Sequence, residues 1–167
     1  MIILGIDPGL ATMGYGVINS VKGNYSVIDY GVVTTPKECT LPERLMQLED
    51  GVVELIDTYK PDNISIEELF FTKNVTTGIP VAEARGVILL TAVKKLGSEV
   101  YEYTPNQIKQ AVTGYGRADK QQIQQMVKML LNLNAIPKPD DAADALAVAI
   151  CHAHSGAINE KLSLNRI

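Results

Sequence analysis

The sequence predicts an α/β fold built on a mixed five-stranded sheet covered by helices. Three observations indicate this class: strand-like segments open the chain, short strands then alternate with amphipathic helices, and helical segments close it. Strands joined by tight turns pair antiparallel, whereas strands joined through a helix pair in parallel. The order β-β-β-α-β-α-β-α-α-α therefore indicates an antiparallel meander followed by α/β crossovers.

The first half of the chain supplies the meander, one helix and the fourth strand. Residues 2–7 are rich in branched aliphatic side chains, and this strand ends at Asp7 because Pro8 cannot donate to a ladder. Glycines then allow a tight return. Alternating β-branched residues, and leucines spaced three and four apart, predict the next elements. These are strands at about 15–20 and 25–35, a helix at about 42–59 and a strand at about 64–69.

The second half continues with helices and one short strand. A polar loop at 72–78 precedes a helix at about 80–96 and a strand at 100–103. Further helices are predicted at about 105–113, 118–132 and 140–154, and the first two are joined by the flexible basic connector 114–117. With no repeat or inter-domain linker, we expect a single domain over residues 1–167.

Composition indicates a globular protein. Of 167 residues, 46% are hydrophobic, yet no apolar run is long enough to span a bilayer, and we expect neither a signal peptide nor a membrane partner. Cys39 and Cys151 are isolated, which is typical of reduced cysteines in a cytoplasmic protein. His152 and His154, near the end of the last predicted helix, are expected to be capping or surface residues rather than ligands.

The net charge of −4 argues mildly against nucleic-acid binding, which usually depends on basic patches. The objection is weak, because acids gathered around a metal would be neutralised and because the distribution of charge matters more than its sum.

Three acidic positions stand where sites usually form. Asp7 ends the first strand, Glu67 and Glu68 follow apolar residues of the fourth, and Asp141 and Asp144 share one face of the last helix. The three aspartates and one of the two glutamates could form a cluster of four carboxylates, which repels itself unless cations or protons compensate. Oxygen-rich sites of this kind suit Mg²⁺ or Mn²⁺.

Each of these acids also has an explanation that involves no catalytic or metal-binding role. Asp-Pro-Gly is a common turn sequence, so Asp7 could be a turn residue. The Glu67-Glu68 pair could be a solvated strand end. Acids favour the first turn of a helix, and Asp140 would make a good N-cap. The order and spacing of the acids together favour the metal site.

The motifs together resemble the RuvC family of Holliday-junction resolvases, which has the ribonuclease-H-like fold. The resemblance runs from about residue 2 to about residue 154. It is carried by Gly5-Ile6-Asp7-Pro8-Gly9, Ile66-Glu67, Glu83-Ala84-Arg85-Gly86 and Asp141-Ala142-Ala143-Asp144-Ala145-Leu146-Ala147.

The resemblance implies four acidic metal ligands, which by position are Asp7, Glu67, Asp141 and Asp144. It selects Glu67 over its neighbour and Asp141 over Asp140. It also implies two Mg²⁺ per subunit, with Mn²⁺ as a possible substitute, roughly 3.5–4 Å apart and bridged by Asp7. Such a site would hydrolyse phosphodiester bonds by paired symmetric nicks that leave 5′-phosphate and 3′-hydroxyl ends.

The resemblance further places Lys109 and Lys120 near the scissile phosphate and Phe70 against bases at the junction centre. Lys120 is in addition a catalytic candidate that would stabilise charge on the phosphate. Aromatic side chains stack on bases, but Phe70 could also pack in the core.

Three other basic residues complete the predicted DNA contacts: Lys73 in the polar loop, Arg85 and Arg117. Arg85 could instead pair with Glu83 or another acid.

Partners follow from the same resemblance. The family acts in recombination and repair as a homodimer, alongside the branch-migration complex of RuvA and RuvB, and a two-fold dimer suits a junction with two related strands. The dimer face is expected on the helix at about 80–96, whose apolar residues exceed one buried stripe. These are Ile88, Leu89, Leu90, Ala92 and Val93.

Other functions compete with this hypothesis. Asp7-Pro8-Gly9 also resembles the first phosphate loop of actin-like sugar kinases and ATPases, but those need a second lobe, and we expect no nucleotide cofactor. A non-catalytic junction-binding scaffold is a further alternative, which an intact acidic quartet disfavours. The third is a ribonuclease-H-like nuclease acting on an RNA–DNA hybrid.

Overall fold

The computed structural model describes residues 1–69, 75–97 and 99–155, and it has the predicted order of strands and helices. The elements are β1 (Ile2–Asp7), β2 (Thr12–Val21), β3 (Asn24–Thr34), α1 (Leu41–Tyr59), β4 (Asn63–Glu67), α2 (Val75–Leu96), β5 (Val100–Tyr103), α3 (Pro105–Thr113), α4 (Lys120–Leu130) and α5 (Asp140–Ser155).

The sheet is mixed and five-stranded, as predicted, with the strand order β3-β2-β1-β4-β5. The meander β1-β2-β3 is antiparallel, and β4 and β5 add in parallel on the other side of β1. The first strand therefore lies at the centre of the sheet, where both of its neighbours support it. Its carboxyl end, at Asp7, lies at the same edge as that of β4.

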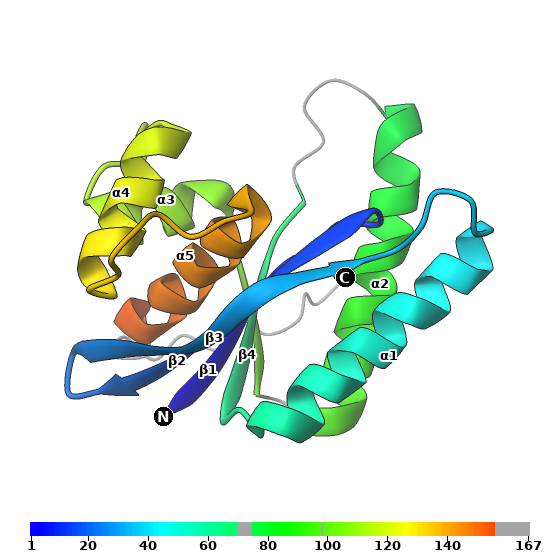
Figure 1. Cartoon of the computed structure of the whole chain (residues 1–167), viewed down its shortest axis with the longest axis horizontal. Coiled ribbons are helices and arrows are strands. Elements are labelled where there is room, and N and C mark those ends of the chain that lie inside the picture. The colour runs from blue at the N-terminus through cyan, green and yellow to red at the C-terminus, as the bar shows by residue number, and fades with distance from the viewer. Residues whose placement is uncertain (70–74, 98, 156–167) are drawn as a thin grey trace.

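Helices cover both faces of the sheet (Figure 1). The helices α1 and α2 pack on one face, and α5 packs on the other with α3 and α4 outside it. Alternation along β1 divides its side chains between two cores: Leu4 and Ile6 face α1 and α2, whereas Ile3 faces α5. Within the described residues, no helix is long and apolar enough to cross a membrane.

Two helix starts differ from the predictions. The helix α2 begins at Val75 rather than near 80, so Pro80 lies inside it and residues 75–78 are helical rather than part of a polar loop. The helix α4 begins at Lys120 rather than at 118, because Asp119 caps it by accepting a hydrogen bond from the Gln122 backbone N–H.

The prediction that His152 is a capping or surface residue is wrong. Only 4% of its surface is exposed, and its Nδ1 lies 2.8 Å from the Tyr103 hydroxyl. The ring of Tyr101 packs on it at a centroid distance of 4.4 Å. Residues 152 and 154 point to different sides of α5, because His154 is exposed and contacts the Ala111 carbonyl, as a surface residue was expected to do.

Burial of His152 predicts a loss of stability in acid. Desolvation lowers the pKa of His152 from 6.5 to about 4, although the negative charge of Glu99 opposes this shift. The unfolded chain therefore binds a proton more readily than the folded one between these two values. The stabilisation is complete above pH 6.5 and is lost as the pH falls through 4, by up to about 3 kcal/mol.

Urea unfolding across this pH range measures the effect, with His152→Gln as the comparison. The variant should be less stable at neutral pH, because it loses the fitted ring, and its stability should fall less steeply with acid. Parallel pH profiles for the two proteins would contradict the assignment of this proton to His152.

Candidate active site

Two of the predicted acids lie side by side at the edge of the sheet. Asp7 ends β1 and Glu67 ends β4, and the preceding residues Ile6 and Ile66 are register partners. Because side chains alternate along a strand, both carboxylates point to the face covered by α5, as Ser65 also does. With its raised pKa, the Asp7 carboxyl group can hold a proton and donate it in a hydrogen bond to the Glu67 carboxylate. The strand pairing therefore determines how these two acids meet.

The neighbouring Glu68 points the other way. Its backbone N–H donates to the Tyr103 carbonyl at 2.8 Å, and its negative charge acts on Arg85 rather than on Asp7. Alternation along β4 thus separates two adjacent glutamates that the residue pattern alone did not distinguish.

The helix α5 brings the other two acids to the same place. Its first turn lies over Gly14, the register partner of Asp7 in β2. A Cβ atom on Gly14 would lie only 2.0 Å from the backbone oxygen of Asp141 and 3.2 Å from its Cβ. The absence of a side chain at residue 14 therefore allows Asp141 and Asp144 to approach the strand ends.

Burial and mutual repulsion disturb the titration of this cluster. The pKa of Asp7 rises from 3.8 to about 8, first because of burial and then because of the charges of Glu67 and Asp144. Asp141 adds a smaller contribution, and Lys120 opposes the shift. Burial also raises the pKa of Glu67 and of Asp144. The four acids thus act on one another as a single electrostatic unit.

Lysines from α3 and α4 border the acids. Lys120 Nζ lies 3.0 Å from Asp144 Oδ2, and the positive charge of Lys109 acts on Glu67. Both lysines line a hollow of about 190 Å³ together with Glu67 and Asp144. The structure thus brings both lysines to the acidic cluster.

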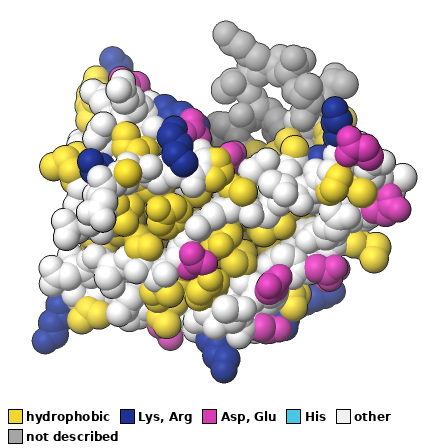
Figure 2. Space-filling view, in the orientation of Figure 1, with side chains coloured by type: hydrophobic (Ala, Val, Ile, Leu, Met, Phe, Trp, Pro, Cys, Tyr) yellow, Lys and Arg dark blue, Asp and Glu magenta, His cyan; other side chains and the backbone are white. Residues whose placement is uncertain are grey.

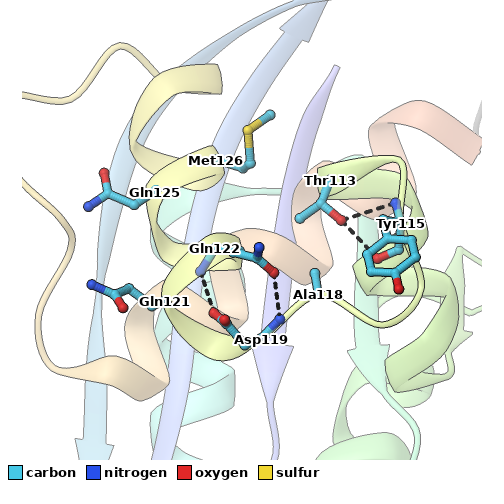
Figure 3. Close-up of a pocket in the computed structure, with 8 residues that line it drawn as sticks. All are labelled: Thr113, Tyr115, Ala118, Asp119, Gln121, Gln122, Gln125 and Met126. Carbon is cyan, nitrogen blue, oxygen red and sulfur yellow. Dashed lines mark hydrogen bonds between the residues drawn. The ribbon is translucent and has the colours of Figure 1, made fainter.

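The connection between α3 and α4, shown in Figure 3, leads directly into the helix that begins at Lys120. Thr113 Oγ1 donates to the Tyr115 carbonyl and accepts from its backbone N–H, and Asp119 caps the following helix. A second hollow, of about 460 Å³, opens beside this connection. Although it is larger, it lacks the acids and lysines of the first, and its carboxylate, Asp119, is engaged in the cap. We therefore place the active site in the smaller hollow.

The donor set of the acidic cluster fits a hard divalent cation. All four side chains offer carboxylate oxygens, and the raised pKa of Asp7 shows that its negative charge lacks sufficient compensation from the protein alone. Within the described ranges, no three Asp, Glu, His or Cys side chains already enclose a metal position. Asp144 turns instead towards Lys120, so these carboxylates would have to converge further around an ion.

The other residues predicted to contact DNA lie outside the acidic cluster or outside the described residues. Arg85 forms an ion pair with Glu102 of β5 beneath α2, so the structure favours the ion-pair alternative for this residue. Arg117 is exposed on the connector before α4. Phe70 and Lys73 lie outside the described residues.

Sequence reasoning missed one residue at the rim of the site. The sequence offers Asp140 as a helix cap or as the alternative to Asp141 in the acidic pair, but not as a partner of lysines. It is the first residue of α5 and contacts two lysines. The pattern Lys-Pro-Asp-Asp offered no means to predict that one of them comes from α4.

Comparisons with known proteins give one consistent family. The family model for crossover junction endodeoxyribonuclease RuvC matches residues 3–152. A crossover junction endodeoxyribonuclease RuvC from Alkaliphilus oremlandii is 57% identical over 98% of this chain and 99% of the relative. One from Caldanaerobacter subterraneus subsp. tengcongensis is 55% identical over 99% of this chain and all of the relative (100%).

Solved structures agree. The Thermus thermophilus RuvC structure superposes with a TM-score of 0.86 at 34% identity, covering 95% of this chain and 96% of that one. The structure of T. thermophilus RuvC in complex with Holliday junction substrate gives a TM-score of 0.85 at 30% identity, covering 95% and 97%.

The contact between Gly14 and α5 predicts the effect of Gly14→Ala. The added methyl group would meet backbone, which cannot rotate away, so the first turn of α5 must shift. We expect a loss of roughly 1–3 kcal/mol in the free energy of unfolding, measured with urea.

Gly86→Ala is the matched control, because a Cβ there meets nothing within 4 Å and alanine suits a helix interior. It should leave stability unchanged or raise it. If Gly14→Ala were no less stable than Gly86→Ala, the first turn of α5 would tolerate displacement at Gly14 and the prediction would be wrong.

Proposed function

The chain belongs to the RuvC family of crossover junction endodeoxyribonucleases, and we propose that Asp7, Glu67, Asp141 and Asp144 form its divalent-metal site. It is a Holliday-junction nuclease with the ribonuclease-H-like fold, and we propose that residues 1–167 form one nuclease domain. The observation that supports the metal site best is the convergence on Asp7, whose pKa of about 8 reflects burial among three other acids.

The reaction we propose is hydrolysis of a phosphodiester bond in each of two related strands, leaving 5′-phosphate and 3′-hydroxyl ends. We propose Mg²⁺ as the cofactor, two ions per subunit, with Mn²⁺ as a substitute. When bound, such ions activate water and stabilise charge on the oxygens of the phosphodiester. Asp7, Glu67, Asp141 and Asp144 would hold the ions, and Asp7 is central among them because the charges of the other three all act on it.

Protein residues would supply the rest of the chemistry. Lys120, whose Nζ stands beside Asp144, is placed to stabilise negative charge that develops on the phosphate. Lys109 shares the hollow and would contact a phosphate oxygen, and the exposed Arg117 would contact the strand beyond. Phe70 and Lys73 remain proposed contacts for the junction centre and the DNA backbone. Arg85 is not among the proposed DNA contacts, because its guanidinium forms an ion pair with Glu102.

The distribution of charge allows DNA binding despite the net charge of −4. Figure 2 shows acidic side chains gathered over α1, which lies on the face of the sheet opposite α5. The acids of α1 are Glu43, Glu49, Asp50, Glu54 and Asp57. The proposed DNA contacts on α3, α4 and their connector thus lie across the sheet from this negative surface.

We propose that two copies of the chain form a homodimer through α2. Most of the apolar residues predicted for this face belong to the core instead: Ile88 and Ala92 are fully buried, and Leu89 and Val93 pack against the core. Leu90 is 56% exposed and gives the helix its outward apolar surface. A two-fold axis there would place two active sites on one junction.

The biological setting is also part of the proposal. We propose that the enzyme acts in homologous recombination and DNA repair together with a branch-migration complex of RuvA and RuvB. Its DNA substrate places it in the cytoplasm of a bacterial cell. Nothing in the proposed chemistry requires a membrane or a nucleotide cofactor.

Cleavage of defined substrates tests the proposed site. With Mg²⁺, a mobile four-way junction should receive paired symmetric nicks, whereas linear duplex and an RNA–DNA hybrid should remain intact. Chelator, or Asp7→Asn, should reduce the rate by roughly a hundredfold or more. Junction binding in chelator should persist, and calorimetry should detect weaker Mg²⁺ binding to the variant. Cleavage of the RNA–DNA hybrid instead of the junction would show that the proposed substrate is wrong.

The adjacent glutamates provide a matched pair of variants. Glu67→Gln should abolish cleavage, whereas Glu68→Gln makes the same chemical change on the opposite face of β4 and should cleave nearly normally. Normal cleavage by Glu67→Gln would remove this residue from the site.

Leu90→Glu tests the dimer. Placing a charge in the proposed interface should raise the dimer dissociation constant roughly tenfold or more, as measured by sedimentation velocity. Met46→Glu is the control, because Met46 is 64% exposed on α1. Equal effects of the two variants would place the interface elsewhere.

A further inference from the structure

Four charged side chains at the start of α5 form a continuous chain of ion pairs. Lys138 Nζ lies 2.6 Å from Asp140 Oδ1, and the other oxygen of Asp140, Oδ2, lies 3.5 Å from Lys120 Nζ. Lys120 Nζ in turn lies 3.0 Å from Asp144 Oδ2. Asp140 thus contacts a different lysine with each of its two oxygens.

The two acids that contact Lys120 are not equivalent. Asp144 belongs to the acidic cluster, where it acts on Asp7 and Glu67, and it is one of the proposed metal ligands. An oxygen that is drawn into the cluster is less available to a lysine. Asp140 is not a proposed metal ligand, and its side chain is 43% exposed against 29% for Asp144. Its charge acts on Asp144, whereas Asp7 and Glu67 respond to other groups.

We propose that Asp140 is a positioning residue that holds the Lys120 ammonium group at the rim of the active site through the Lys138–Asp140–Lys120 contacts. The proposal rests on the function proposed above for Lys120. Its physical basis is that a lysine on a flexible stem loses placement when a nearby partner is removed, and small misplacements of a reacting group slow catalysis.

Lys138 supports this geometry from the other side. Its contact with Oδ1 restrains the rotation of the Asp140 carboxylate, which leaves Oδ2 directed at Lys120. The pairs are more than 40% exposed, so their value lies in the placement of the charge rather than in stability.

A role in starting the helix is the competing explanation, because acids favour the first turn. Asp140→Asn separates the two. Asparagine is accepted at helix starts and has nearly the same shape, but it removes the negative charge that faces both lysines. A role in starting the helix predicts that Asp140→Asn loses some thermal stability, because the charge that favours the helix dipole is gone, and keeps its cleavage rate. A positioning role predicts a slower cleavage rate with unchanged thermal stability.

The experiment measures junction cleavage by Asp140→Asn under single-turnover conditions. We expect the rate constant to fall roughly three- to tenfold. Thermal unfolding and junction affinity in chelator should be unchanged. Asp57→Asn is the matched control, because it makes the same change at an exposed carboxylate that pairs with Lys95, away from the site.

A double-mutant cycle identifies the path of the effect. In the background of Lys120→Ala, itself expected to be roughly a hundredfold slower, Asp140→Asn should cost nothing further. Side-chain NMR of the metal-free protein supplies a readout other than activity. The order parameter of the Lys120 side chain should fall in Asp140→Asn and stay constant in Asp57→Asn.

The outcomes separate the two proposals. If Lys120→Ala cleaves normally, the proposed role of Lys120 is wrong, and the role of Asp140 falls with it. If Lys120→Ala is slow but Asp140→Asn is normal, or if the two effects add, only the positioning role is overturned. An unchanged order parameter of Lys120 in Asp140→Asn would overturn it as well.

Discussion

The close approach of α5 to the central strands is the constraint on which the rest of the structure depends. A Cβ on Gly5 would lie 2.2 Å from the Ala145 carbonyl, and one on Gly16 would lie 2.7 Å from Leu146. The glycines therefore let the backbone of α5 lie against the sheet at Gly5 and leave room for the Leu146 side chain at Gly16. Larger residues would separate the layers and carry Asp144 away from the strand ends. The composition of this interface thus sets the distance between the acids.

The same packing gives the acidic cluster a cost in folding free energy. Bringing acids together in a partly buried place raises the pKa of Asp7 to about 8, and a fold that gained nothing from it would have little reason to keep such repulsion. The surrounding cores are large enough to offset this cost: Ile3, Leu4 and Ile6, which precede Asp7, are fully buried. Burial of the aliphatic side chains of β1 thus offsets the free-energy cost of burying the Asp7 carboxyl group at the end of the same strand.

Local patterns predicted most of the fold, because strand alternation and helical spacing are properties of neighbouring residues. They also predicted which segments carry the acids. They did not separate Glu67 from Glu68, which depends on which face α5 covers. They also did not predict burial of His152 and did not decide between the two alternatives for Arg85. These depend on contacts between segments distant in sequence, for which no local pattern exists. The partner of Lys120 at Asp140 escaped prediction for the same reason.

The order of elements also links the active site to the proposed dimer. Glu67 ends β4, and only residues 68–74 separate it from the start of α2 at Val75. The helix that carries the exposed Leu90 therefore follows directly from a strand that carries a proposed metal ligand. Because α2 packs on the opposite face of the sheet from α5, a partner bound there would leave the acids accessible to DNA. In the proposed dimer, the face of the sheet covered by α2 would set the distance between the two active sites, and the face covered by α5 would carry the proposed catalytic residues.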